Sequence, residues 1–262
     1  AARSSYSVNK SMETSMERLA SGKRINSAAD DAANLAISTR ITAEIQGLKQ
    51  SIKNAADAQS LLNVTEGALT EVHTILLRMR ELAVQSSNDT VRDQDRDMLQ
   101  MEVAQLEAEI QRISDDTTWS GMTLLAGGFS TGATFQIGPR DTDTIQISIA
   151  AIDATTAAQL ALSSHVSTQA AAQDYIATID NAISKISEQR GKYGAVMNRL
   201  DHAMANMQNI VTNLSTAKGR LEDADFAAES ANLARTQVLQ QASMAMLSQA
   251  NASKQNILAL FQ

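Results

Sequence analysis

The chain has 262 residues and a net charge of −7, and aromatic residues make up only 3% of it, against 44% for apolar residues as a whole. It contains one proline and no cysteine, which excludes disulfides, thiolate metal sites and cysteine nucleophiles. The acidic balance, without a long basic run, argues against nucleic acid and against an anionic membrane as partners. So few helix breakers and large core residues favour long helices in thin layers over a thick core.

The N-terminal segment, residues 1–31, is rich in small and amide side chains. Its apolar residues are spaced apart, and they include Val8, Met12, Met16 and Leu19. Such spacing is typical of an amphipathic helix. We therefore expect a helix here that needs a partner to cover its apolar face.

Three later segments show a 4-3 spacing of apolar residues. They cover about residues 32–87, 97–115 and 172–221. A period of about 3.5 residues over many turns predicts long helices with coiled-coil-like packing. At a rise of about 1.5 Å per residue the last helix would be roughly 70 Å long. The predicted fold class is therefore mainly α, an elongated rod of long helices.

A short region between the second and third of these helices has a different pattern. Residues 134–137 and 144–149 alternate apolar and polar side chains on either side of a polar turn. This alternation predicts one small β-hairpin region at about residues 133–150. Residues 88–97 are polar and predict a turn between the first two long helices, and residues 150–173 read as a loop or a weak helix.

The C-terminal segment, residues 223–262, resembles the N-terminal one in kind. Its stretch from Thr236 to Ser253 has no charged residue, which raises the question of a membrane span. The stretch holds too many amides and hydroxyls for the hydrocarbon of a bilayer. We therefore predict no membrane insertion, and expect a helix in a crowded protein interior beside the N-terminal helix.

One acidic run has part of the spacing of a calcium-binding loop. Asp93, Asp95 and Asp97 occupy the first three ligand positions, but Met98 stands at the glycine position and Ala104 at the position of the bidentate glutamate. A solvated turn between helices explains the run better.

The rest of the sequence offers little material for catalysis. The three histidines, His73, His165 and His202, form no zinc-binding pair, and no phosphate-binding glycine motif occurs. Carboxylates such as Glu102 and Glu107 read as a hydrated helix face. We predict no catalytic residue, no cofactor and no metal site, and an interaction or structural protein.

Strings along nearly the whole chain closely resemble bacterial flagellins. Residues 17–33 (ERLASGKRINSAADDAA) resemble the N-terminal signature of that family, and residues 222–229 (EDADFAAE) resemble the C-terminal one. Shorter matching strings lie between and beyond them, at residues 65–69, 80–86, 135–138, 240–242 and 249–251.

The resemblance implies a secreted structural subunit that self-assembles into the flagellar filament used for motility. Such subunits are exported unfolded, without a cleaved signal peptide, and are added at the distal tip of an extracellular filament. Residues 1–31 and 223–262 would form the inner-tube domain, and residues 32–222 the outer-tube domain. The implied partners are further copies of the chain, an export chaperone, and cap and junction proteins. We place Leu247, Leu258 and Phe261 in the polymerisation interface.

The sequence departs from the family pattern in two places. About twenty family residues are missing before Ala1, and there is no initiator methionine, so the N-terminal end is expected to be truncated. Residues 152–170 are too few for the large outer domains of many flagellins. We expect a minimal flagellin with a smooth filament.

The string at residues 77–85 (LRMRELAVQ) resembles the segment by which many flagellins bind Toll-like receptor 5. The matching recognition positions are Arg78, Leu82 and Glu102. Arg78 and Leu82 are four residues apart and share a helix face, whereas Glu102 joins them only if the two helices pack antiparallel. Leu82 also fits the 4-3 core, and the two charged residues also fit an ordinary surface.

Two other readings stay open. A hook–filament junction protein would resemble flagellin at both termini, although residues 80–86 and 240–251 favour a filament subunit. Another type III secreted coiled-coil protein, such as a translocator or adhesin, would be expected to carry a membrane-inserting helix or a receptor domain. An enzyme would need an inserted catalytic domain, and the chain has no room for one.

Overall fold

The computed structural model describes all residues except 1, 130, 153–159, 161, 163–165 and 260–262, and it leaves the side chains of residues 2 and 250–259 undescribed. The described chain is mainly helical, as predicted. Its helices are α1 (Ala2–Ser21), α2 (Ala32–Ser86), α3 (Asp93–Asp116), α4 (Gln169–Glu222) and α5 (Phe226–Ala259). Its strands are β1 (Thr118–Trp119), β2 (Met122–Thr123), β3 (Ala133–Gln136) and β4 (Thr144–Ile147). No helix in the described ranges is long and apolar enough to cross a membrane.

The chain folds into two compact units. Residues 1–46 and 210–262 form one, which we call the terminal unit, and residues 47–209 form the other, the middle unit. The helices α2 and α4 contribute to both. The boundaries predicted from the sequence, at residues 31 and 223, follow the helix ends instead, and the assignment of these parts to an inner and an outer tube stays a prediction.

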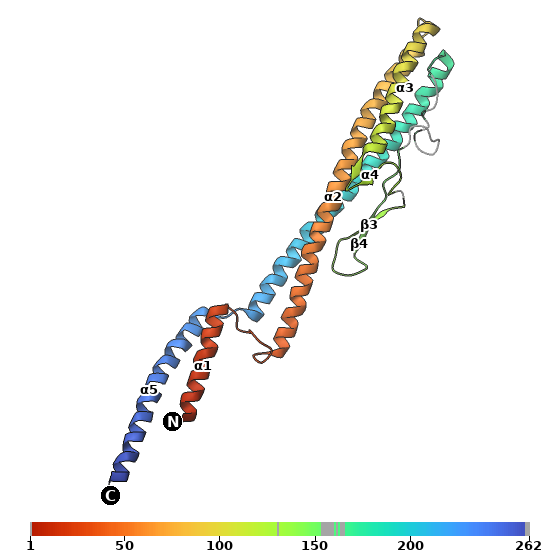
Figure 1. Ribbon diagram of the computed structural model, residues 1–262. Coiled ribbons are helices and arrows are strands. Elements are labelled where there is room, and N and C mark those ends of the chain that lie inside the picture. The colour runs from red at the N-terminus through yellow and green to blue at the C-terminus, as the bar shows by residue number, and fades with distance from the viewer. Residues whose placement is uncertain (1, 130, 153–159, 161, 163–165, 260–262) are drawn as a thin grey trace. The chain divides into compact units, whose positions relative to one another are not determined.

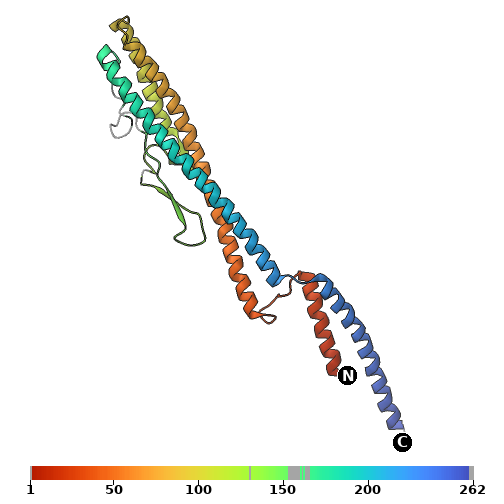
Figure 2. The same cartoon turned by 180° about the vertical axis from the view of Figure 1, so that it is seen from behind.

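The middle unit is a layer of three helices, in which α3 and α4 both run antiparallel to α2 (Figures 1 and 2). Ion pairs fix the register of α2 and α4. Arg80 Nε lies 2.7 Å from Asp180 Oδ1, and Arg190 Nε lies 2.7 Å from Glu66 Oε1. The core includes buried residues of α3 and α4, such as Ile110 and Tyr175, and a row of buried α2 side chains three or four residues apart: Leu48, Ser51, Ala55, Ala58, Leu62, Thr65, Leu69, Val72, Leu76, Met79 and Ala83.

Helix α3 begins earlier than the sequence pattern indicates. The polar run up to residue 97 reads as a turn, yet the helix starts at Asp93. Asp93 and Asp95 lie in its first turn, where carboxylates interact favourably with the partial positive charge of the helix N-terminus. The acidic run is thus part of a helix start.

The β1–β2 pair is a small antiparallel ladder that periodicity does not predict. Trp119 pairs with Met122, so Ser120 and Gly121 form a two-residue turn. Both have positive φ angles, 50° and 82°. A turn with both central residues in the left-handed region is the mirror-image type that suits the twist of a hairpin, and it favours Asn followed by Gly.

Because Ser120 occupies a position that asparagine tolerates better, Ser120→Asn should stabilise the middle unit. We expect the free energy of unfolding to rise by about 0.5 kcal/mol, in the range of backbone-compatible turn substitutions. Urea denaturation followed by circular dichroism would measure it. Gly121→Ala is the opposing control and should lower stability; equal stability of both variants would contradict the turn assignment.

The predicted hairpin is formed by β3 and β4, with Phe135 paired to Ile145. Its buried side chains are Ile145 and Ile147. Asn54 Nδ2 of α2 donates a hydrogen bond to Gln136 O over 3.0 Å. A Cβ added to Gly47 would lie 3.3 Å from Pro139 Cβ, so glycine lets the loop of the hairpin contact α2.

In the terminal unit α1 and α5 lie side by side and antiparallel (Figures 1 and 2). Asn9 Oδ1 accepts a hydrogen bond from Gln240 Nε2 over 2.9 Å, and Ser15 donates one to Glu229. A connector at residues 22–31 joins α1 to α2, and residues 223–225 join α4 to α5. An isolated antiparallel bridge between Lys23 and Asp223 links the two connectors. The two ends of the chain therefore meet in one unit.

Candidate interaction sites

Two of the predicted receptor residues come together on the exposed side of α2 and α3. Arg78 Nε and Nη2 both lie 2.9 Å from Glu102 Oε1, and Arg78 Nη1 lies 2.6 Å from Glu81 Oε2. The antiparallel packing needed to join these residues is present. Hydrogen bonds to Glu81 and Glu102 raise the pKa of Arg78 above its ordinary value, so that the group stays charged.

The third predicted residue of this group lies in the core. Leu82 is 1% exposed, in the middle of the three-helix layer. Arg78 and Glu102 are therefore open to solvent, whereas Leu82 is not. The exposed apolar side chains nearest in sequence are Leu77 and Val84 on α2, and Met98 and Met101 on α3.

A buried arginine holds α3 against the end of α2. Arg96 is 5% exposed. Its Nε–H and Nη2–H donate hydrogen bonds to the carbonyl oxygens of Ser86 and Asn88, each over 2.8 Å, and Nη1 lies 3.0 Å from Asp93 Oδ1. A planar guanidinium with several donors suits this cluster of acceptors. Arg96 thus fixes the turn that sets Glu102 opposite Arg78. The burial of Arg96 could not be predicted from the sequence, because it stands in a polar run that resembles a solvated turn.

In the terminal unit, one face of α5 contacts α1. Side chains on this face are buried or half-buried, and they recur about every three or four residues: Glu229, Leu233, Thr236, Gln240, Ser243 and Leu247. A polar pocket of about 380 Å³ lies between the helices, lined by Ser15, Arg18, Glu229, Arg235 and other side chains. This contact face is mostly polar, which is unusual for a helix pair that must be stable by itself.

Apolar side chains of α5 lie away from α1. Val238 and Met246 are 65% and 67% exposed, and Leu239 is also exposed. By the 100° rotation per residue of a helix, Val238 lies opposite Glu229, and Leu239 and Met246 lie together to one side of the face that contacts α1. A helix with apolar residues on several faces is normally buried on several faces. This face of α5 therefore needs a second partner.

Of the three predicted interface residues, Leu247 lies on the face toward α1 and is half-buried. Phe261 is outside the described residues, and Leu258 is in the part of α5 whose side chains are not described. Their part in polymerisation stays a prediction.

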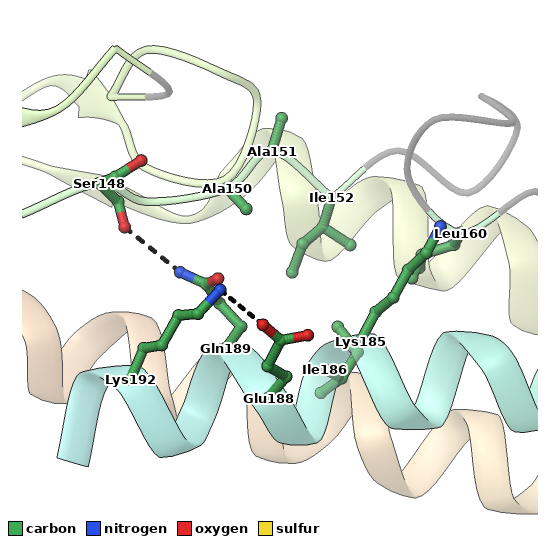
Figure 3. A pocket seen from close by; sticks show the side chains of 10 residues that line it. All are labelled: Ser148, Ala150, Ala151, Ile152, Leu160, Lys185, Ile186, Glu188, Gln189 and Lys192. Carbon is green, nitrogen blue, oxygen red and sulfur yellow. Dashed lines mark hydrogen bonds and ion pairs between the residues drawn. The ribbon is translucent and has the colours of Figure 1, made fainter. Parts of the chain in front are cut away.

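A recess of about 430 Å³ lies between α4 and the segment that follows β4 (Figure 3). Its floor includes Ile152, Leu160 and Ile186. Lys192 Nζ at the rim is 2.7 Å from Glu188 Oε1, and Gln189 Nε2 donates a hydrogen bond to Ser148 O over 3.3 Å. The described lining has no histidine or cysteine, and its carboxylate is paired with a lysine. Among the described residues, no three His, Asp or Glu side chains are placed to hold a metal ion.

Residues 1–130 match the bacterial flagellin N-terminal helical region, and residues 176–261 match the bacterial flagellin C-terminal helical region. Together these two regions cover most of the chain.

Individual proteins agree with this result. The chain is 42% identical to flagellin of Halalkalibacterium halodurans over 250 residues, which cover 95% of this chain and 92% of that protein. It is 37% identical to the flagellar filament 31.3 kDa core protein of Treponema maltophilum over 268 residues, covering 97% and 94%. The crystal structure of Bacillus cereus flagellin is similar with a TM-score of 0.53 and 32% identity, covering 63% of this chain and 94% of that chain. The chain belongs to the bacterial flagellin family.

Proposed function

We propose that this protein is a structural subunit of an extracellular bacterial flagellar filament and polymerises with copies of itself. The observation that carries the proposal is the apolar outer face of α5, with Val238, Leu239 and Met246 exposed in the single chain. Relatives of nearly the same length are flagellins and a flagellar filament core protein. A filament grows without end by heterologous contacts, and such contacts would cover this face.

The finer proposals follow the family resemblance. Residues 1–31 and 223–262 form an inner tube and residues 32–222 an outer tube. The subunit is exported unfolded with the help of a chaperone, and it is added at the distal tip next to cap and junction proteins. The absence of cysteine suits a chain that must thread through a channel and refold, since no disulfide can form on the way.

Electron microscopy after seeding with filament fragments tests the main proposal. We expect long filaments made of this protein alone. A hook–filament junction protein would add only at a filament end and would form no long homopolymer. Failure to elongate any flagellar seed at high protein concentration would overturn the proposal.

We also propose that the monomer binds Toll-like receptor 5 through Arg78 and Glu102, with Leu82 as their support. Arg78 is well suited to a binding hot spot, because arginine combines charge with a flat, partly apolar surface. Its pairing with Glu102 joins α2 and α3 into one surface. In the filament we expect neighbouring subunits to cover this surface, so that the monomer is the active form.

Arg78→Ala should weaken binding of the monomer to the receptor by about 2 kcal/mol, roughly thirtyfold, which is the usual scale for a hot spot. Glu102→Ala should weaken it less, and surface plasmon resonance with the receptor ectodomain would measure both. Arg112→Ala is a matched control, because Arg112 is an exposed arginine of α3 that is likewise paired with two carboxylates. Unchanged affinity in both test variants would contradict the site, and no binding by the wild type would contradict receptor recognition altogether.

A further inference from the structure

The terminal unit contains two buried carboxylates that the proposed function does not yet use. Glu222 is the last residue of α4 and Glu229 lies in the first turn of α5, and each is 8% exposed. A carboxylate is rarely buried unless it is paired, because removal from water costs much free energy. The partners of these two carboxylates therefore show which parts of the chain they hold together.

All but one of the partners of Glu222 come from the N-terminal half of the chain. Ser38 of α2 donates a hydrogen bond to Glu222 Oε1, and Lys23 Nζ in the connector lies 3.3 Å from Glu222 Oε2. The exception is Lys218 on α4, whose Nζ lies 3.9 Å away. Arg24 adds two further links, from its backbone N–H to Glu222 O over 2.5 Å and from Nη2 to Leu221 O over 2.8 Å.

Glu229 repeats this arrangement seven residues later. Its Oε2 accepts a hydrogen bond from Ser15 Oγ over 3.0 Å, and its Oε1 lies 2.9 Å from Arg18 Nη1. Both partners belong to α1. On its own helix Asn232 is within reach, and Arg235 lines the same polar pocket. Each buried carboxylate thus lies close to the start of α5 and binds a hydroxyl and a cationic group from residues 15–38.

We infer that Glu222 and Glu229 are positioning residues that, as ionised carboxylates, hold the N-terminal segment in register with the C-terminal one and thereby shape the polymerisation surface. The inference rests on the proposed filament function. The mostly polar face between α1 and α5 would tolerate a slip along the helix axis, and a slip of one turn displaces side chains by about 5.4 Å. The pair of Arg18 with Glu229 opposes such a slip of α1 along α5, and the pair of Lys23 with Glu222 fixes the connector after α1 beside the end of α4. In each pair the carboxylate is buried and the cation is partly exposed, and a charge out of register would lose its partner.

The register matters for assembly because the exposed apolar residues lie on both helices. Tyr6 and Met16 are exposed on α1, and Val238, Leu239 and Met246 are exposed on α5. A neighbouring subunit that covers both helices needs them in one fixed arrangement. Correct pairing of the carboxylates is therefore a condition for complementary packing, although neither carboxylate need contact the neighbour.

The charge requirement gives this role a pH dependence. Burial raises the pKa of Glu222, but the hydrogen bonds from Ser38 and Lys23 and the charge of Lys218 outweigh it and hold the pKa below its ordinary value. The hydrogen bond from Arg18 likewise lowers the pKa of Glu229, against a smaller opposing effect of burial. A lowered pKa in the folded state means that the stabilisation is fully present above the ordinary glutamate pKa of about 4.3 and is lost as the pH falls below it.

The test compares glutamine variants, which keep the shape and one acceptor oxygen but lose the charge. Glu222→Gln, Glu229→Gln and the double variant are polymerised from seeds at pH values from 7.5 to 3.5, and the critical concentration is measured. Glu188→Gln is the matched control, since Glu188 is also ion-paired and has a lowered pKa, but is exposed on α4 in the middle unit. Hydrogen exchange of residues 2–21 and 226–249 is followed in monomer and filament.

At pH 7 we expect each test variant to raise the critical concentration about tenfold or more, the scale of a hydrogen bond to a charged group, while Glu188→Gln leaves it unchanged. The ratio between variant and wild type should begin to fall below about pH 4.3 and approach one as the pH falls through the lowered pKa values, because the wild-type carboxylates then become protonated too. Faster exchange in both terminal helices of the variants should accompany the effect.

Equal critical concentrations at pH 7, or a ratio that does not change with pH, would overturn the inference while leaving the filament proposal intact. Failure of the wild type to polymerise would overturn the filament proposal. The positioning role of the two carboxylates would then be tested by amide hydrogen exchange of the terminal helices in the monomer. Protection of the terminal helices in wild-type monomer that is lost in the glutamine variants would support the positioning role. Exchange that is the same in wild type and variants would overturn it.

Discussion

Replacing Arg96 with alanine should lower the free energy of unfolding of the middle unit by about 3 kcal/mol. The substitution removes the donor to the buried carbonyl oxygen of Ser86, and one of the two donors to the carbonyl oxygen of Asn88, which also accepts from the Val91 N–H. An unsatisfied buried group costs roughly 1–3 kcal/mol. The substitution also leaves a cavity at a position that is 5% exposed. Urea denaturation followed by circular dichroism, combined with hydrogen exchange at residues 76–103, would locate the loss at the turn between α2 and α3.

Two further variants test whether the lost stability comes from the hydrogen bonds donated by the buried guanidinium of Arg96. Arg92→Ala removes an exposed arginine from the same turn and should change stability by less than about 0.5 kcal/mol. Arg96→Lys keeps the charge but cannot reach all acceptors at once, and it should fall between the wild type and Arg96→Ala. If Arg96→Ala and Arg92→Ala were equally stable, the hydrogen bonds of Arg96 would make no measurable contribution to stability.

The triple variant Val238→Gln, Leu239→Gln, Met246→Gln should abolish filament formation while leaving the middle unit folded. Burying one such apolar side chain contributes about 1.5–3 kcal/mol, so three together contribute roughly 5 kcal/mol or more at each subunit addition. Because each 1.4 kcal/mol corresponds to about a tenfold change, the critical concentration should rise by more than about a thousandfold. Sedimentation of seeded polymer and electron microscopy would show the loss.

Glutamine is chosen because its helix propensity is high, so that α5 itself is not weakened. Met122→Gln is the control for a lost exposed apolar side chain elsewhere, since Met122 lies in β2 of the middle unit. Filaments of the triple variant at wild-type concentrations would show that this face of α5 is not a polymerisation surface.

Periodicity predicted the long helices well, because buried apolar residues leave a direct trace in the sequence. On α4 the residues Tyr175, Ile179, Ala182, Ile186, Tyr193, Leu200 and Met207 are buried at this spacing, whereas Gln189 and Val196, which fit the same spacing, are only half-buried. On α2 the row is mixed. Ser51 and Ala58 are buried beside the larger apolar residues, while the expected Ile52 and Gln59 are only half-buried. Small buried residues such as serine and alanine add little to a hydrophobic pattern, so the sequence near them does not show which residues of the 4-3 repeat face the core.

Features fixed by polar contacts were harder to predict. Composition showed that residues 88–97 are polar but not that Arg96 is buried among backbone carbonyls, because the pattern does not reveal a partner. The same is true of Glu222 and Glu229, which bind residues about 180 to 210 positions away. The β1–β2 turn had a local signal in Ser120–Gly121, but strands of two residues are too short to show alternation. Arg78 and Glu102 were found by family resemblance, and their pairing follows from the antiparallel helices.

The antiparallel arrangement of α2 and α4 implies an order of folding. Near the end of α2, Ser86 Oγ donates a hydrogen bond to the carbonyl oxygen of Val166, which lies just before α4, across 80 residues. The links Arg80–Asp180 and Glu66–Arg190 span 100 and 124 residues. Loop closure costs more entropy for longer loops, but a longer link adds little once a shorter one has formed. The pairing of α2 with α4 can therefore start beside the turn and proceed step by step toward the two chain termini. The contacts between α1 and α5 would then form last, since Ser15 and Glu229 are 214 residues apart and Asn9 and Gln240 are 231 residues apart. A defect anywhere along α2 and α4 would therefore impair the pairing of the two terminal helices.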